Sequence, residues 1–276
     1  MLQVSPTQIK PFQKTVWEYY RKHKRSFPWR ETTDPYKIMV SEIMLQQTQA
    51  ERVVPKFNAF IKRFPTVKSL AQAPLSEVLT LWQGLGYNRR ALFLKRAAEE
   101  VVSKHSGKIP ATLEALDALP GIGPYTAGAI LAFAFNKPTV FIETNIRTVF
   151  IHHFFKKARG KIADEKLLPL ITTSLDRKRP RDYYSALMDY GSHLKMTLPN
   201  PSRKSTTHTK QSTFKGSHRE LRGQILKHIL VYKKVTINSL RRQLSHQKTS
   251  DIVETINELD FENFIKKHKR YISIVS

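Results

Sequence analysis

Glu42 is the carboxylate whose surroundings in the sequence most suggest chemistry, because it interrupts the apolar run IMVSEIML at residues 38–45. Burial in such a run disfavours the charged form of a carboxyl group and raises its pKa. A carboxyl group that stays protonated near neutral pH can act as a general acid. The alternative is a glutamate on a solvated helix face, which is the usual place for this residue type. The apolar run makes Glu42 the first candidate catalytic residue.

A glycine-containing turn lies in the string LPGIGPYTAGAI at residues 119–130. Its two glycines permit a positive φ and let the main chain approach another molecule closely. A helix that begins near Pro124 would direct free N–H groups and its positive dipole end at that molecule, which suits a phosphate. The pattern predicts a helix-hairpin-helix, which holds a DNA strand through main-chain contacts without reading its sequence. The residues expected to make this contact are Leu119, Gly121, Ile122, Gly123 and Thr126.

The composition indicates a basic protein with a full core. The 276 residues are 40% hydrophobic, so wholesale disorder is not expected. Forty-seven Lys and Arg against 22 Asp and Glu give a formal net charge of +25, which favours a polyanionic partner, with nucleic acid ahead of an anionic membrane.

Cysteine is absent from the sequence, so disulfides, a thiol nucleophile, cysteine-ligated zinc and a cysteine-held iron–sulfur cluster are all excluded. No dedicated metal is expected. No apolar run approaches the roughly 20 residues of a membrane span, and the first residues lack the apolar core of a signal peptide. We therefore expect a soluble cytoplasmic protein, associated with the nucleoid and without membrane contact.

The elements that would position these residues are helices. Asp34 and Pro35 offer an N-cap and a first-turn proline for a helical run over residues 36–57. Strands and helices do not alternate along the chain, so the expected class is mainly α. The other segments with helical spacing of apolar residues are 8–24, 70–82, 91–106, 113–119, 125–135, 145–155 and 183–194.

The last part of the chain differs in composition. Residues 196–217 are rich in Ser, Thr, Lys and Pro and predict a basic linker. Residues 218–276 read as three short amphipathic helices and a final alternating strand, which predicts a small winged-helix-like domain. Residues 200–276 hold 16 Lys and Arg against 6 Asp and Glu, a net charge of +10. This module either docks on DNA or is a helical cap with a solvated basic face.

Four strings in the chain resemble a known family in order and spacing. They are the hairpin and MVSEIMLQQTQ (39–49), LWQGLGYNRRA (81–91) and FIETNIRTV (141–149). Together they are similar to the adenine DNA glycosylase (MutY-type) branch of the helix-hairpin-helix glycosylases. The resemblance covers residues 8–195 and implies a glycosylase domain of two helical lobes, with the extruded base in the cleft between them.

The resemblance also implies roles for individual residues. Glu42 matches the family's general acid, and Asn145 matches an Asn that holds the acid pair and the attacking water. Glu143 stands where the family has Asp, so its carboxylate is one methylene further from the backbone. It could stabilise the oxocarbenium ion or attack it covalently, or the position could be structural. Tyr125 replaces the Schiff-base lysine of related lyases, which implies hydrolysis without strand cleavage.

Contacts to the base and the duplex follow from the same resemblance. Gln46 and Gln47 would meet base edges, and Tyr87 would wedge into the stack at the mispair. The residues expected around the flipped base are Trp29, Arg30 and Asp189. In the family a four-cysteine cluster loop follows, whose positions are here approximately Lys195, Ser202, Ser205 and Gln211. We expect neither that cluster nor the family's Nudix-like C-terminal domain in this chain.

The sequence thus predicts a monomeric, monofunctional DNA glycosylase of base excision repair. Its expected partner is double-stranded DNA with a mispaired or damaged base, with adenine opposite guanine or 8-oxoguanine as the leading substrate. One alternative is thymine or uracil removal from mispairs with guanine, because related mismatch enzymes also carry Tyr at position 125. The other is a non-catalytic protein that binds mispaired DNA.

Overall fold

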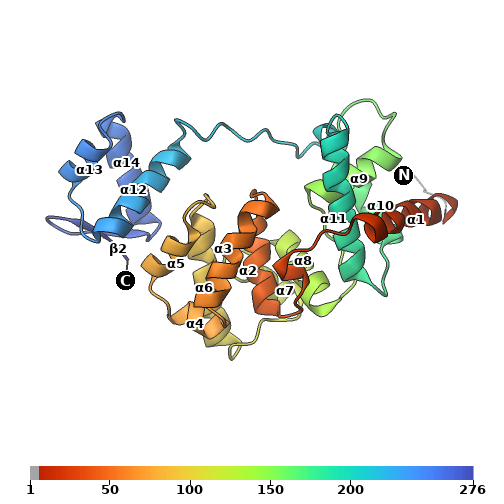
Figure 1. The fold of residues 1–276 in the computed structure, drawn as a ribbon, viewed down its shortest axis with the longest axis horizontal. Coiled ribbons are helices and arrows are strands. Elements are labelled where there is room, and N and C mark those ends of the chain that lie inside the picture. Colours follow the sequence, from red (N-terminus) through yellow and green to blue (C-terminus); the bar gives the residue numbers. More distant parts are fainter. Residues whose placement is uncertain (1–5, 276) are drawn as a thin grey trace. The chain divides into compact units, whose positions relative to one another are not determined.

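The computed structural model describes residues 6–275, which form fourteen α-helices, two short 3-10 helices and one two-stranded sheet (Figure 1). The predicted mainly α class is confirmed. By contacts the chain divides into two compact units, which we describe separately. Within residues 6–275 no helix is both long and apolar enough to span a membrane.

The first unit contains the described residues up to Glu42 together with Pro110–Ala118 and Ile122–Lys210. Its helices are α1 (Pro6–His23), η1 (Pro28–Arg30), α7 (Leu113–Asp117), α8 (Pro124–Phe135), α9 (Thr144–Phe154), α10 (Asp164–Ser174), α11 (Pro180–Thr197), η2 (Pro201–Lys204) and most of α2 (Pro35–Leu45).

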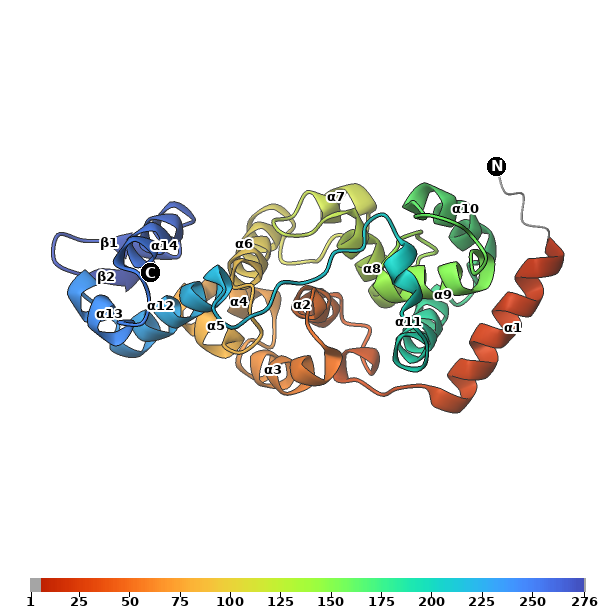
Figure 2. The same cartoon turned by 90° about the horizontal axis from the view of Figure 1, so that it is seen from above.

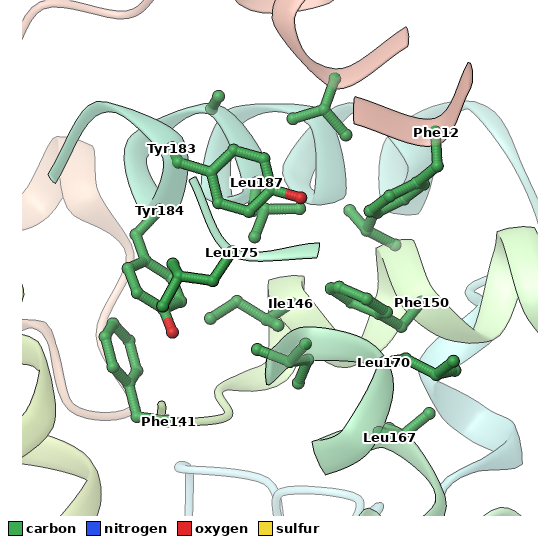
Figure 3. Close-up of a cluster of buried hydrophobic side chains, with 14 of the residues drawn as sticks. Phe12, Phe141, Ile146, Phe150, Leu167, Leu170, Leu175, Tyr183, Tyr184 and Leu187 are labelled. Carbon is green, nitrogen blue, oxygen red and sulfur yellow. The ribbon is translucent and has the colours of Figure 1, made fainter. Parts of the chain in front are cut away.

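Helix α11 packs against α9 and α1 in the core of this unit. Phe141 and Tyr184 stack there with ring centroids 4.0 Å apart, and Figure 3 shows them beside Ile146 and Leu187. Gly191 of α11 permits the close approach to α9, since a Cβ at this position would lie 2.3 Å from the backbone oxygen of Asn145. The glycine thereby fixes where the start of α9 sits.

The second unit contains Ile43–Ile109, Leu119–Gly121 and the described residues from Gln211 onward. Its elements are α3 (Ala50–Arg63), α4 (Val67–Gln72), α5 (Leu75–Trp82), α6 (Arg89–Lys104), α12 (His218–Tyr232), α13 (Ile237–Gln243), α14 (Thr249–Phe261), β1 (Ile265–Lys267) and β2 (Ile272–Ile274).

The C-terminal module contains the three predicted helices, and the predicted final strand is the second strand of a hairpin (Figure 2). Strands β1 and β2 pair antiparallel, with Ile265 opposite Ile274, and Val235 adds an isolated bridge to Ile272. Helix α12 packs against α14, β2 and α5. By contacts residues 211–276 therefore group with residues 43–109, and the boundaries 8–195, 196–217 and 218–276 remain a prediction.

The continuous helix expected over residues 36–57 was wrong. Helix α2 ends at Leu45 and α3 begins at Ala50, with Gln47 between them in the left-handed region at a φ of +55°. The predicted start is confirmed, because Asp34 Oδ1 accepts a hydrogen bond of 2.9 Å from the N–H of Tyr36.

Candidate active site

Two acidic side chains and a tyrosine meet inside the first unit. Glu42 lies on α2 with 6% of its surface exposed, and Tyr125 lies in the first turn of α8. The Tyr125 hydroxyl forms a hydrogen bond with the Glu42 carboxyl group. The Tyr125 ring packs edge-on against Phe141, with centroids 5.7 Å apart. The apolar run around Glu42 thus buries its carboxyl group, as its sequence pattern indicated.

Glu143 is the N-cap of α9. Its Oε1 accepts a hydrogen bond of 2.9 Å from the N–H of Ile146, and its Oε2 accepts one of 3.1 Å from the side-chain amide of Asn145. Acidic residues are favoured at helix N-termini, because they satisfy free N–H groups and face the positive dipole end. The same carboxyl group is therefore both a helix cap and part of the acidic cluster with Glu42.

The two carboxyl groups differ in the neighbours that act on their pKa values. Burial, and next the charge of Glu143, raises the pKa of Glu42 to about 8, against smaller opposing effects of Arg30 and Tyr125. Glu42 is therefore mainly protonated at neutral pH. Burial also raises the pKa of Glu143. Hydrogen bonds from Asn145 and Ile146 and the charges of two nearby cations, Lys195 and Arg147, oppose this rise. Both carboxyl groups thus have raised pKa values, and at Glu143 the donors Asn145 and Ile146 oppose the effect of burial.

The three residues predicted for the base pocket also lie together in the first unit. The Asp189 carboxylate is 2% exposed and makes a bidentate pair with Arg30, at 2.7 and 2.9 Å. Arg25, which the sequence analysis missed, adds a contact of 2.6 Å from Nε to Asp189. Trp29 stacks on Phe27 with ring centroids 5.0 Å apart. Asp189 therefore fixes the loop before α2 through two guanidinium groups.

Gln46, Gln47 and Tyr87 lie on two turns of the second unit that Arg90 joins. The buried Arg90 guanidinium donates to the carbonyl oxygens of Met44 (2.9 Å) and Gly86 (3.0 Å) and to others of both turns. Tyr87, at a φ of +48°, lies near the cationic groups of Arg90 and Arg219, at 5.6 and 4.9 Å from its ring centroid. These turns owe their shape to a guanidinium group more than forty residues downstream of the first.

The predicted hairpin is present, and the side chains of three of its five candidate DNA-contact residues are buried. Gly121 has a φ of +75°, and a Cβ there would lie 2.6 Å from Cβ of Phe93, so this position requires glycine. Gly123 is the N-cap of α8 and has open space around its Cα. The side chains of the other candidates are buried: Leu119, Ile122 and Thr126.

A model of a known protein family matches the part of the sequence that holds the acidic pair. The model of the HhH-GPD superfamily base excision DNA repair protein matches residues 40–171, which include Glu42, Tyr125, Glu143 and Asn145. The matched residues 40–171 belong to the HhH-GPD superfamily. Trp29, the first of the predicted pocket residues, lies before the matched range.

Curated relatives of the HhH-GPD region carry a common name. The adenine DNA glycosylase of Buchnera aphidicola subsp. Baizongia pistaciae is 36% identical over 181 residues, which cover 65% of this chain and 52% of the relative. The human adenine DNA glycosylase is 34% identical over 207 residues, covering 71% and 37%. This chain therefore spans about half, or less, of the length of these relatives.

A solved structure shares the fold beyond the HhH-GPD match. A thermostable thymine-DNA glycosylase superposes with a TM-score of 0.63 at 27% sequence identity, covering 72% of this chain and 93% of that chain. The helical glycosylase fold inferred from the motifs is thereby confirmed.

The positions expected for a cluster loop do not fit an iron–sulfur cluster. Ser202 and Ser205 are buried, and Ser202 Oγ donates a hydrogen bond to Asn200 Oδ1 at 2.8 Å. Neither the hydroxyl groups of these serines nor the Lys195 ammonium supplies the thiolates that such clusters require. No group of three metal-ligating side chains is found within residues 6–275.

Two cations near the acidic pair escaped the sequence analysis as site residues. Lys195, noted only as a cluster position, lies on α11, and its charge favours the ionised form of Glu143. Arg147 acts on Glu143 in the same direction and is itself held by Asp164 at 2.6 and 2.8 Å. The four-residue spacing of Glu143 and Arg147 on one helix face was the available signal.

Proposed function

We propose that this chain is a monofunctional DNA glycosylase that hydrolyses the N-glycosidic bond of a mispaired base in base excision repair. The observation that carries the proposal is the buried Glu42 carboxyl group beside Glu143, with the Tyr125 hydroxyl group hydrogen-bonded to it. The partner is double-stranded DNA with a mispaired base, bound by a monomer. Adenine is the proposed base on the strength of the relatives' names, and we propose guanine or 8-oxoguanine as the base opposite it.

The proposed reaction needs the two carboxyl groups in opposite states. Glu42 gives its proton to a ring nitrogen of the extruded purine, so that the base leaves as a neutral molecule when its bond to C1′ breaks. The Glu143 carboxylate stabilises the positive charge on the sugar, water adds to C1′, and the proton of that water goes to a carboxylate. The products are the free base and an abasic site. Because a phenol does not form an imine, Tyr125 supports hydrolysis without strand cleavage.

No cofactor enters this proposal. The reaction is acid–base and electrostatic, and it requires no redox change. We propose that backbone hydrogen bonds to the residues before α10 hold the segment after α11 in place of a cluster. Ile162 supports this, because its N–H donates to the carbonyl oxygen of Lys204 at 2.7 Å and its carbonyl oxygen accepts from Thr206 at 3.0 Å.

A second candidate substrate is thymine or uracil opposite guanine. The 27% identical thymine-DNA glycosylase structure favours this alternative, because its TM-score of 0.63 comes with coverage of 93% of that chain. The two candidates differ in the leaving base and share the acidic pair.

The deciding experiment is single-turnover incubation with duplexes that carry one A·8-oxoguanine, A·G, T·G or U·G pair. Strand breakage only after alkali, lost in Glu42→Gln and kept in the exposed-residue control Glu114→Gln, is the expected result. The duplex that reacts identifies the base that is released. Tight binding of mispaired duplexes without release of any base would instead indicate a non-catalytic DNA-binding protein.

A further inference from the structure

The C-terminal module carries a groove that the proposed glycosylase chemistry does not use. The groove has a volume of about 480 Å³ and lies where the end of α12, the loop after it and α13 meet. It is lined by His228, Tyr232, Lys234, Thr236, Ser239 and Arg242, among others. Its lining therefore combines two cations, two hydroxyl groups and two aromatic rings.

The acidic residues of the module lie on a different element. Five of the six acidic residues of 218–276 are on α14 or directly after it, and Glu258, Asp260 and Glu262 form ion pairs. Arg222 of α12 pairs with Glu258 at 3.0 Å and with Glu262 at 2.8 Å. Most acidic residues of the module thus belong to its third helix or follow it, and none of them lines the groove. The lining of the groove therefore holds no carboxylate that would repel a polyanion.

The groove cations are available to such a ligand. Within residues 6–275 neither Lys234 nor Arg242 forms an ion pair with a carboxylate. Lys234 Nζ instead lies 5.0 Å from the ring centroid of Tyr271, which holds its ammonium at the groove without neutralising it. Tyr232 is 63% exposed and packs beside His228, with ring centroids 4.5 Å apart. A large exposed aromatic ring in the same groove as two cations is an arrangement suited to a nucleic-acid strand.

We propose that this groove is a second DNA site, which binds backbone phosphates of duplex DNA without reading bases. Arg242 and Lys234 neutralise phosphates, and the hydroxyl groups of Thr236 and Ser239 line the same path. The mixture of donors and an aromatic ring favours a phosphodiester backbone over a lipid surface, which would call for an apolar face beneath the cations. This site is separate from the hairpin and adds affinity that does not depend on the mispair.

The test compares the intact chain with a double variant, Lys234→Gln and Arg242→Gln. Its matched control, Lys62→Gln and Lys68→Gln, removes two exposed cations of the same unit that do not line the groove. Dissociation constants for an undamaged duplex are measured over a range of salt concentrations. Each phosphate contact contributes about 0.9 to the slope of log K against log salt, so the groove variant should lose about 2 and the control almost nothing.

Equal slopes for the groove variant and the intact chain would overturn the proposal, and equal losses in the groove variant and the control would reduce it to a general charge effect. Equal unfolding temperatures of all three proteins establish that the variants are folded. Loss of binding to phosphatidylserine vesicles, with the DNA slope unchanged, would assign the groove to membranes instead. Since undamaged duplex requires no catalysis, failure of this inference is distinct from failure of base release by the intact chain.

Discussion

The guanidinium group of Arg219 lies over the ring of Tyr87, 4.9 Å from the ring centroid, and donates a hydrogen bond to the Tyr87 hydroxyl group. Its other nitrogen donates to the carbonyl oxygen of Ser212 at 2.8 Å. Arg219 thereby connects the start of the C-terminal module to the turn at Tyr87. Tyr87 has a positive φ of +48°, which is uncommon for a residue other than glycine.

Replacement of Arg219 by Ala should loosen this turn. The N–H of Arg90 donates to the carbonyl oxygen of Tyr87 at 2.9 Å, so its hydrogen exchange reports opening of the turn. Loss of a cation–π contact and one hydrogen bond costs about 1 kcal/mol, which corresponds to roughly fivefold faster exchange. Lys227→Ala, an exposed change on the same helix, is the control. Equal exchange rates in both variants would show that Arg219 does not support Tyr87.

Stability should depend on pH through Glu42. The unfolded glutamate ionises near its ordinary pKa of 4.5, whereas the folded one keeps its proton up to about pH 8. Unfolding therefore releases a proton between these values, and stability falls as the pH rises through them. Glu42→Gln removes this effect. As the pH rises, the unfolding free energy of the variant should therefore exceed that of the parent protein by a margin that grows to several kcal/mol, since each unit of pKa is worth about 1.4 kcal/mol.

Calorimetry from about pH 5 to about pH 8 checks this expectation, with Glu114→Gln as the exposed control. The control should follow the parent protein at every pH. A difference between Glu42→Gln and the parent that stays constant over the range would mean that Glu42 ionises normally in the folded protein.

The sequence predicted the acidic site of the first unit better than the turns of the second unit. The apolar run identifies burial of Glu42, and Asp34 marks the start of its helix, because both signals are local. The break after Leu45 has no glycine or proline to announce it. It depends on Arg90, whose guanidinium group binds the carbonyl oxygens there and lies more than forty residues away in the sequence. The pairing of Arg25 with Asp189 joins residues 164 positions apart and is equally invisible to periodicity.

The single-turnover rate should depend more on a negative charge at position 143 than on the length of the side chain there. Glu143→Gln keeps an acceptor for the N–H of Ile146 but removes the carboxylate, so the single-turnover rate should fall by about 10²- to 10³-fold. Glu143→Asp keeps both the charge and the capping ability and should retain more activity than the amide. Measurement of both rates with matched unfolding temperatures separates chemistry from capping. A normal rate for Glu143→Gln would leave this residue as a helix cap alone.

Arg90 should be the costliest basic residue to remove. Arg90→Met leaves the carbonyl oxygens of two turns without their donor, and we expect a loss of about 3 to 5 kcal/mol in unfolding free energy. Arg90→Lys should recover only part of it, since one ammonium does not span both turns. Arg89→Met is the matched control, because its partner Glu262 is 3.5 Å away and its side chain is 62% exposed. Chemical denaturation that ranks the two methionine variants equally would refute this role.

Tyr125→Phe tests the contact between the phenol and the proposed acid. The hydrogen bond from Tyr125 favours the ionised form of Glu42 and so lowers its pKa, while the ring maintains the burial that raises it. Phenylalanine keeps the ring against Phe141 and removes only the hydrogen bond. The pKa of Glu42 should therefore rise above about 8, and the alkaline limb of the single-turnover pH profile should move to higher pH. A limb that stays in place or moves to lower pH would mean either that Glu42 is not the group titrating there or that the hydroxyl group does not act on it.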